Sequence, residues 1–115
     1  MENGKVIMKK LICALSIFGA LAIAAQAADV KQVWEENCAK CHGPDGKGKT
    51  RMGQKLGVRD YTDSTVQASV KDEDAAKAIK EGVKQDGKEK MKGFGDKLSD
   101  QEIKDLVAHI RSFKK

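Results

Sequence analysis

The sequence predicts a small all-α domain of three to five short helices. Apolar residues recur at three- and four-residue steps in two segments, near residues 29–41 and 99–113. Glycine-rich stretches separate the helical segments, and no run alternates polar and apolar residues as a half-buried strand does. The chain has 115 residues, which is enough for one domain.

Residues 1–27 have the features of a secretory signal. A positively charged start precedes an uncharged apolar run over residues 11–25, and a small-x-small cleavage site ends at Ala27. We therefore expect cleavage after Ala27, export to the periplasm, and a mature domain over residues 28–115. The alternative is a retained membrane anchor, but the run of about 15 residues is shorter than the roughly 20 that span a bilayer. No stable membrane insertion is expected after cleavage.

Cleavage would leave a modestly basic domain. The leader holds three of the 22 basic residues and one of the 17 acidic residues, so the formal charge falls from +5 to +3. Both signs are spread along the chain without the concentrated basic stripe that nucleic acid requires, so we expect no nucleic-acid partner. A domain this small often needs a disulfide, a metal or a cofactor for stability.

Two cysteines remain after cleavage, in the segment Cys38-Ala39-Lys40-Cys41-His42. Cys-x-x-Cys-His is the signature of haem attachment. Residues three and four apart share one face of a helix, so both sulfurs can reach the two vinyl groups on one porphyrin edge. The imidazole of the next residue can then reach the iron. The motif predicts one haem c, bound covalently through Cys38 and Cys41, with His42 as an iron ligand.

Three other uses of this motif explain less of it. A zinc site needs two more ligands, and only His109 is left as a plausible one. A thioredoxin-like dithiol needs a strand before the motif, where the sequence is helix-like. A structural disulfide between Cys38 and Cys41 gives no reason for His42.

The first half of the mature chain is expected to hold one clear helix. It runs from Asp29 to Cys41 and carries Trp34 on the same face as the cysteines. Gly43 and Pro44 end it directly after His42, and residues 43–62 are expected to form a loop. A short helix around residues 64–70 has weaker support.

The second half is expected to hold two helices with an irregular segment between them. Residues 72–81 begin with acidic side chains and end at a glycine, as a helix does. Residues 83–97 contain three glycines and are expected to be irregular. The last helix has the clearest signal, because Ser99 and Glu102 form a capping box before an apolar stripe.

The second iron ligand has three candidates in the mature chain. Met91 lies in the glycine-bearing segment between the last two helices, where a polar sequence gives it no evident core to fill. Met52 lies only ten residues after His42, and a short tether keeps it near the side of that imidazole. His109 lies off the apolar stripe of the last helix. We expect Met91 to be the ligand, and a thioether ligand raises the reduction potential relative to two nitrogen ligands.

These motifs resemble the class I c-type cytochromes, in their small soluble bacterial branch. The resemblance rests on Trp34 one turn before Cys38, on the haem-attachment motif, on Met91-Lys92-Gly93-Phe94 and on the closing helix. It implies a small cytochrome c-like fold of three to five short helices wrapped around one covalent haem. It also implies that the first and last helices cross over the haem, with Trp34 packed near Leu106.

Three positions depart from the pattern of that family. Many members have proline where this chain has Lys92, which would leave the loop around Met91 less stiff. Many have tyrosine where His109 stands, which puts the usual aromatic packing in question. Val30 replaces a glycine often found at the helix crossing, so a wider crossing is expected.

The expected function is electron transfer between protein partners, without a bound substrate and without catalysis. We expect a monomer that uses a lysine-rich surface to dock acidic redox partners. Two other functions stay open: a haem subunit of a larger respiratory complex, or a small-gas sensor or peroxidase if Met91 is not a stable ligand. A solvated lysine-rich face is the alternative for the basic side chains near the motif and Met91, namely Lys40, Lys47, Lys49, Lys88, Lys90 and Lys92. Arg59 and Tyr61 are candidates for contact with a haem propionate.

Overall fold

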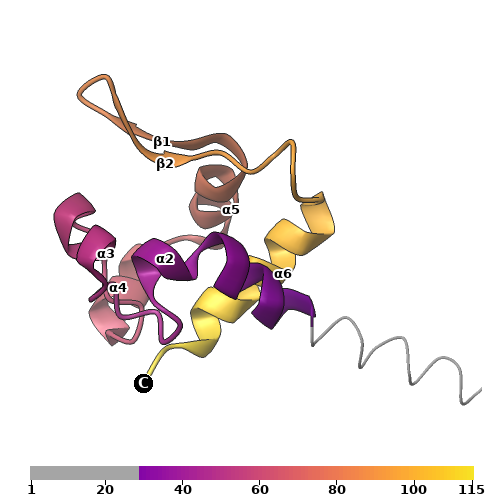
Figure 1. The fold of residues 1–115 in the computed structure, drawn as a ribbon. Coiled ribbons are helices and arrows are strands. Elements are labelled where there is room, and N and C mark those ends of the chain that lie inside the picture. The colour runs from indigo at the N-terminus through magenta and orange to yellow at the C-terminus, as the bar shows by residue number, and fades with distance from the viewer. Residues whose placement is uncertain (1–28) are drawn as a thin grey trace, which may run out of the picture.

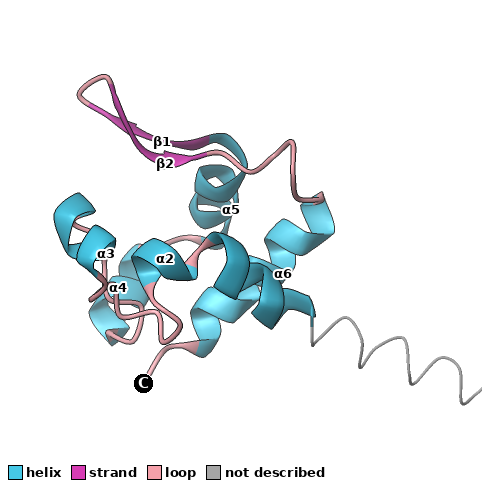
Figure 2. Cartoon of the chain, in the orientation of Figure 1, coloured by secondary structure: helices cyan, strands magenta, loops and turns pink. Residues whose placement is uncertain are grey.

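Residues 29–115 are the part of the chain that this computed structural model describes, and they are mainly helical with one two-stranded sheet (Figures 1 and 2). The predicted signal segment, residues 1–27, and its cleavage site lie outside the described residues. No helix within residues 29–115 is long and apolar enough to cross a membrane. The predicted helical fold class is confirmed, with the small sheet as an addition.

The predicted helix over residues 29–41 is present with one irregularity. A first helix spans residues 29–37, a turn follows at Cys38, and α2 spans Ala39–His42. Backbone bonding continues through the turn, because the Cys38 amide donates to the Trp34 carbonyl at 2.8 Å and the His42 amide donates to the Cys38 carbonyl at 3.0 Å. The haem-attachment motif therefore lies on the end of a helical segment.

The predicted loop over residues 43–62 is wrong in its middle, where α3 spans Arg51–Leu56. Thr50 caps this helix, because its hydroxyl accepts a hydrogen bond from the Gly53 amide at 2.9 Å. The next helix, α4, spans Ser64–Ser69 and confirms the weaker prediction.

α5 spans Asp72–Glu81, as predicted, but the segment after it is not irregular. An antiparallel hairpin forms there, with β1 at Gly82–Gln85 and β2 at Lys88–Lys92. The hairpin projects from the helical body (Figure 2). The prediction of irregular structure over residues 83–97 is thus corrected for the hairpin.

α6 spans Asp100–Ser112 and has the predicted capping box. The Ser99 hydroxyl accepts from the Glu102 amide at 3.1 Å, and the Glu102 carboxylate accepts from the Ser99 amide at 3.0 Å. Both bonds satisfy amides that the first helical turn leaves open, so the start of α6 is fixed locally.

The core joins the first helix to α6, which lie together in Figure 1. Leu106 is fully buried and shares a cluster with Trp34, as the family resemblance implies. Val30 packs at the margin of this cluster. The His109 ring lies 5.3 Å from the Trp34 ring and 4.9 Å from the Phe113 ring. The imidazole therefore packs against aromatic rings at the position where many family members have tyrosine.

Candidate haem-binding site

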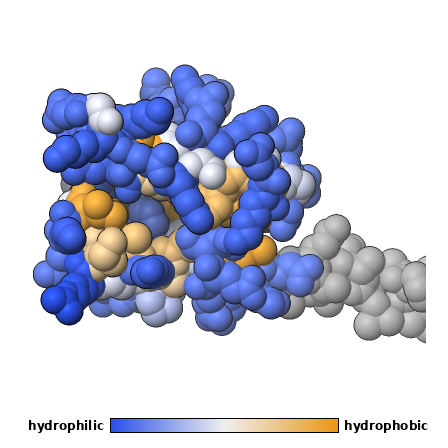
Figure 3. All heavy atoms as spheres, turned by 45° about the horizontal axis from the view of Figure 1, so that its top comes forward, coloured by the Kyte–Doolittle hydropathy of each residue, from blue (hydrophilic) through white to orange (hydrophobic). Residues whose placement is uncertain are grey.

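A cavity of about 530 Å³ opens between α2, α5, the hairpin and the loop after α3. Figure 3 shows apolar surface gathered in a hollow with hydrophilic side chains around it. The volume is in the range of cofactor sites, and an apolar lining favours a flat hydrophobic group over a polar ligand. The apolar lining includes Leu56, Val58, Val70, Ala75, Ala78, Ile79, Val83 and Ile110.

The two cysteines of the motif are free thiols at this cavity. Cys38 is 7% exposed and lines the cavity, and Cys41 is half-buried beside it. Burial, with the neighbouring Cys41 as a second cause, raises the pKa of Cys38 to about 11. The Cys38 thiol therefore stays neutral and unpaired, available for a thioether bond.

The half-buried His42 imidazole lines the same cavity. Its Nδ1 atom is buried and has no hydrogen-bond partner among the described residues. Burial lowers the pKa of His42, which favours the neutral form of the ring. The Tyr61 ring stacks on it at 5.3 Å with an interplanar angle of 21°. A neutral imidazole held by ring contacts, with a nitrogen left open, suits metal ligation.

Hydrogen bonds fix the end of the helix that carries His42. The Trp34 indole Nε1 donates to the Gly43 carbonyl at 2.9 Å, and this bond is buried. The Thr50 hydroxyl donates to the Cys41 carbonyl at 2.7 Å, and the Gly48 amide donates to the His42 carbonyl at 2.8 Å. These three donors satisfy carbonyls that the helix end leaves open, so the motif is held from several sides.

The structure separates the three candidates for the second ligand. Met91 is half-buried on β2 and lines the cavity together with Cys38 and His42. Met52 is 37% exposed on α3 and is not part of the cavity lining. His109 is partly exposed and packs on the far side of Trp34, again outside the lining.

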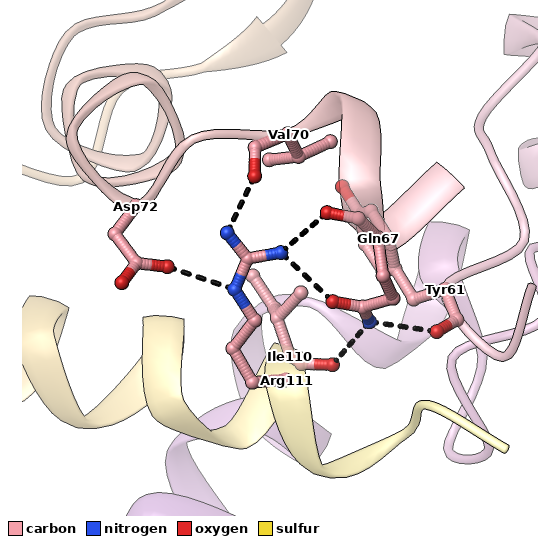
Figure 4. Close-up of polar contacts among 6 residues, drawn as sticks. All are labelled: Tyr61, Gln67, Val70, Asp72, Ile110 and Arg111. Atoms are coloured by element: carbon pink, nitrogen blue, oxygen red, sulfur yellow. Dashed lines mark hydrogen bonds and ion pairs between the residues drawn. The ribbon is translucent and has the colours of Figure 1, made fainter. Parts of the chain in front are cut away.

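A polar network lies next to the cavity and bonds to the backbone of Tyr61, Val70 and Ile110, three residues of its lining (Figure 4). The Gln67 side chain, in a residue only 5% exposed, donates through Nε2 to the Tyr61 carbonyl at 2.7 Å and the Ile110 carbonyl at 2.8 Å. Arg111 donates to the Gln67 side-chain oxygen at 2.9 Å and to the Gln67 carbonyl at 2.8 Å. It also pairs with Asp72 at 2.8 Å. We call the side chains of Gln67, Arg111 and Asp72 the Gln67 network. This network joins α4 to α6.

Cationic side chains stand at the mouth of the cavity. Arg59 and Lys90 line it, and Arg59 also donates to the Ser69 hydroxyl at 3.2 Å. Lys92 lies over the Phe94 ring, with its Nζ 5.3 Å from the centroid. Lys40, Lys49 and Lys88 are exposed, while Lys47 is half-buried.

The residues at this site fit haem c on their own chemistry. The free thiol of Cys38, the imidazole of His42 and the thioether of Met91 line one mainly apolar cavity, and a second free thiol, Cys41, directly precedes His42. The porphyrin would fill the apolar space, and Arg59 and Lys90 could pair with its carboxylates. A zinc site fits less well, since no cluster of three metal-binding side chains occurs within residues 29–115.

Sequence reasoning missed two contributors to the site. Gln67 gives no signal in the sequence, because its partner Arg111 lies 44 residues away. Val83 was missed because the hairpin was not predicted. The Asp86-Gly87 pair between two short segments was the available signal, since this dipeptide favours a tight hairpin turn.

Known proteins are similar in sequence to most of this chain. The chain is 36% identical over 113 residues to cytochrome c6 of Picosynechococcus sp., covering 90% of this chain and 92% of that protein. It is 35% identical over 86 residues to the Cbb3-type cytochrome c oxidase subunit FixPc of Rhizobium leguminosarum bv. viciae. That match covers 71% of this chain but only 26% of the subunit, so the chain spans about a quarter of its length.

Structure and family comparisons agree with the sequence matches. A solved c-type cytochrome designated KustC0563 is similar with a TM-score of 0.67 and 38% identity, over 74% of this chain and 96% of that one. The profile of the Cytochrome c family matches residues 27–114. The chain therefore belongs to the cytochrome c family and is an electron-transfer protein with covalently bound haem c.

Proposed function

We propose that this chain is a periplasmic carrier of single electrons, in which Cys38 and Cys41 hold the haem and His42 and Met91 ligate its iron. The observation that carries the proposal is the shared cavity: Cys38 and His42 from one helical segment and Met91 from β2 line the same mainly apolar space. When bound there, haem c supplies one iron that alternates between the ferric and ferrous states.

The chain's own residues would favour electron transfer at the iron over reaction with oxygen or peroxide. His42 and the thioether of Met91 would both hold the iron, which would leave no open position for oxygen or peroxide. The mainly apolar lining would limit water around the group, so a change of charge would require little rearrangement of the surroundings. These features favour electron transfer over oxygen chemistry.

The test compares Met91→Ala with the matched control Met52→Ala in the purified holoprotein. Met91→Ala should abolish the weak red Met-to-iron band of the ferric form, lower the reduction potential and let ferrous iron bind carbon monoxide. Met52→Ala should leave all three unchanged, because Met52 is outside the cavity. Loss of the band in Met52→Ala, or its persistence in Met91→Ala, would reassign the ligand. A denatured mass equal to apoprotein alone would reject haem attachment through Cys38 and Cys41.

The proposed partners are redox proteins with acidic docking surfaces. Support comes from Arg59 and Lys90 at the cavity mouth and from the exposed lysines of the hairpin, since a basic rim around a redox centre steers acidic partners. Electron-transfer rates with an acidic partner should fall as salt rises. A rate that does not change with ionic strength would reject this docking mode.

Export, cleavage after Ala27 and the monomeric state belong to the same proposal. They are tested by the N-terminal sequence and native size of the protein in a periplasmic extract. The similarity to the oxidase subunit FixPc supports one alternative, a haem subunit of a larger respiratory complex. Elution of the native protein in a large assembly would favour that alternative over a free carrier.

A further inference from the structure

We infer that the inner half of the hairpin fixes the position of Met91 and that the outer half does not. The hairpin root is defined as the two inner pairs, Gly82 with Lys92 and Val83 with Met91. The outer arm is defined as the two remaining pairs and the turn, residues 84–89. The inference rests on the proposal that Met91 ligates the iron, and it names the residues that position this ligand.

A β-bulge separates the root from the outer arm. Val83 pairs with Met91, but the next residue of β1, Lys84, pairs with Glu89, so Lys90 is the extra residue on β2. A bulge interrupts the ladder and redirects side chains locally. Lys90 and Met91 are consecutive, yet both line the cavity, which regular strand alternation does not allow. Met91 faces the cavity with its partner Val83, and the bulge brings the extra residue Lys90 to the same face and interrupts the ladder between the root and the arm.

The backbone of Met91 and its neighbours packs directly against Gly82. A Cβ atom on Gly82 would lie 2.6 Å from the Met91 carbonyl oxygen and 2.7 Å from the Gly93 nitrogen. Both distances are too short for a real side chain, so the two strands can approach this closely only at a glycine. Gly82 also has φ +85°, a conformation that other residues adopt at a cost. Any side chain here must push on the residue that carries the thioether.

The chain after Met91 is fastened to α5. The Phe94 amide donates to the Ile79 carbonyl at 2.8 Å, and the Gly95 amide donates to the Lys80 carbonyl at 3.0 Å. These carbonyls belong to the last turns of α5, and the Phe94 side chain is buried in the core. Met91 is thus held on one side by Gly82 and on the other by this anchor. These two contacts restrict the backbone around Met91. Lys92 stands where many family members have a proline, and it does not stiffen the backbone as a proline would.

The outer arm packs less closely against the body, and of its residues Gln85 also lines the cavity. Its residues 84–89 are exposed, and a Cβ atom on Gly87 would meet nothing within 4 Å. Gly87 has φ +77°, close to the value at Gly82. Both glycines have a positive φ that alanine adopts at a cost, but Gly82 also has ψ −179°, a region almost restricted to glycine, and only Gly82 touches Met91.

This contrast provides a matched pair of variants, Gly82→Ala and Gly87→Ala, in the holoprotein. Val83→Ala is a second root variant that is expected to fold, because Val83 is 39% exposed and pairs with Met91 only across the ladder. Each ferric protein is titrated with imidazole, which competes with Met91 for the iron, and the red Met-to-iron band and the reduction potential are recorded. Circular dichroism reports whether each variant is folded.

Gly82→Ala should weaken the red band, lower the potential and raise the apparent imidazole affinity by about tenfold, and Val83→Ala should act in the same direction by about threefold. Gly87→Ala should stay within about twofold of wild type. If Gly82→Ala does not fold, the comparison of Val83→Ala with Gly87→Ala decides.

Three other outcomes would overturn the inference. Root variants with wild-type affinity would show that the root does not hold Met91. An equal effect of Gly87→Ala would show that the arm matters as much as the root. A wild-type protein without the red band would reject Met91 ligation itself and the positioning role with it, so the two failures are distinguishable.

Discussion

Replacement of Gln67 by leucine should destabilise the fold through one buried cluster of hydrogen bonds. Leucine is similar in size, so the change removes polar partners and leaves little cavity. Gln67 donates to the carbonyls of Tyr61 and Ile110 and accepts from Arg111. The Ile110 bond is fully buried, whereas the other two are part-buried and within reach of water.

The cost follows from these three bonds. The Ile110 carbonyl keeps the Phe113 amide as a donor at 3.2 Å, so each of the three lost bonds contributes a net of about 0.5–1.5 kcal/mol. Burial of the leucine side chain offsets part of this loss, so we expect a decrease of about 1–3 kcal/mol in the free energy of unfolding. For a domain of this size that corresponds to a fall in melting temperature of roughly 5–25 °C.

Urea unfolding of the holoprotein, followed by circular dichroism, measures this difference. The matched control is Gln101→Leu, because Gln101 is exposed and bonds only to Asp105 one turn along α6, at 3.0 Å. That variant should lose less than about 0.5 kcal/mol. A Gln67→Leu protein as stable as the Gln101→Leu control would refute the claim that the Gln67 network is satisfied inside the protein rather than by water.

Two further predictions concern the aromatic cluster on α6. Trp34→Phe keeps a ring but removes one of the two donors to the Gly43 carbonyl and leaves unfilled space where the larger indole was. The free energy of unfolding in urea should therefore fall by about 1–3 kcal/mol, and no measurable fall would contradict this. His109 packs on Trp34 and Phe113 and faces Lys31; burial, then the charge of Lys31, lowers its pKa in the folded state. The unfolded chain therefore binds more protons just below the usual value of about 6.5, and stability falls as pH falls through that window. Wild type should lose more stability than His109→Tyr between about pH 7 and about pH 5, and parallel pH profiles would contradict the assignment.

The sequence predicts well those elements that local chemistry specifies. The capping box at Ser99 and Glu102 and the apolar stripe behind it determine where α6 begins and which face it buries, and both are present in the structure. The haem-attachment motif likewise depends on spacing alone, which is why Cys38 and His42 could be placed together. In both cases the determining residues are within one or two turns of each other.

The hairpin could not be predicted from periodicity, because its strands have no apolar face. β1 and β2 are largely exposed on both sides, so lysine and glutamate replace the usual alternation. α3 has six residues, too few to show a repeat, and only its cap at Thr50 marks it. The Gln67 network joins residues that are distant in sequence, and side-chain contacts of that kind have no local signature.

The two edges of the hairpin carry a consequence for the behaviour of concentrated protein. Within residues 29–115 the sheet has only two strands, so each has an outer row of backbone amides and carbonyls with no strand beside it. Such rows invite a second copy to add on as a further strand. The positive charges of Lys84, Lys88 and Lys92 repel an approaching copy of the same hairpin. These lysines therefore oppose edge-to-edge pairing between two copies of the chain, in addition to their proposed role in docking redox partners. Concentrated salt screens that repulsion and should therefore promote self-association of the protein.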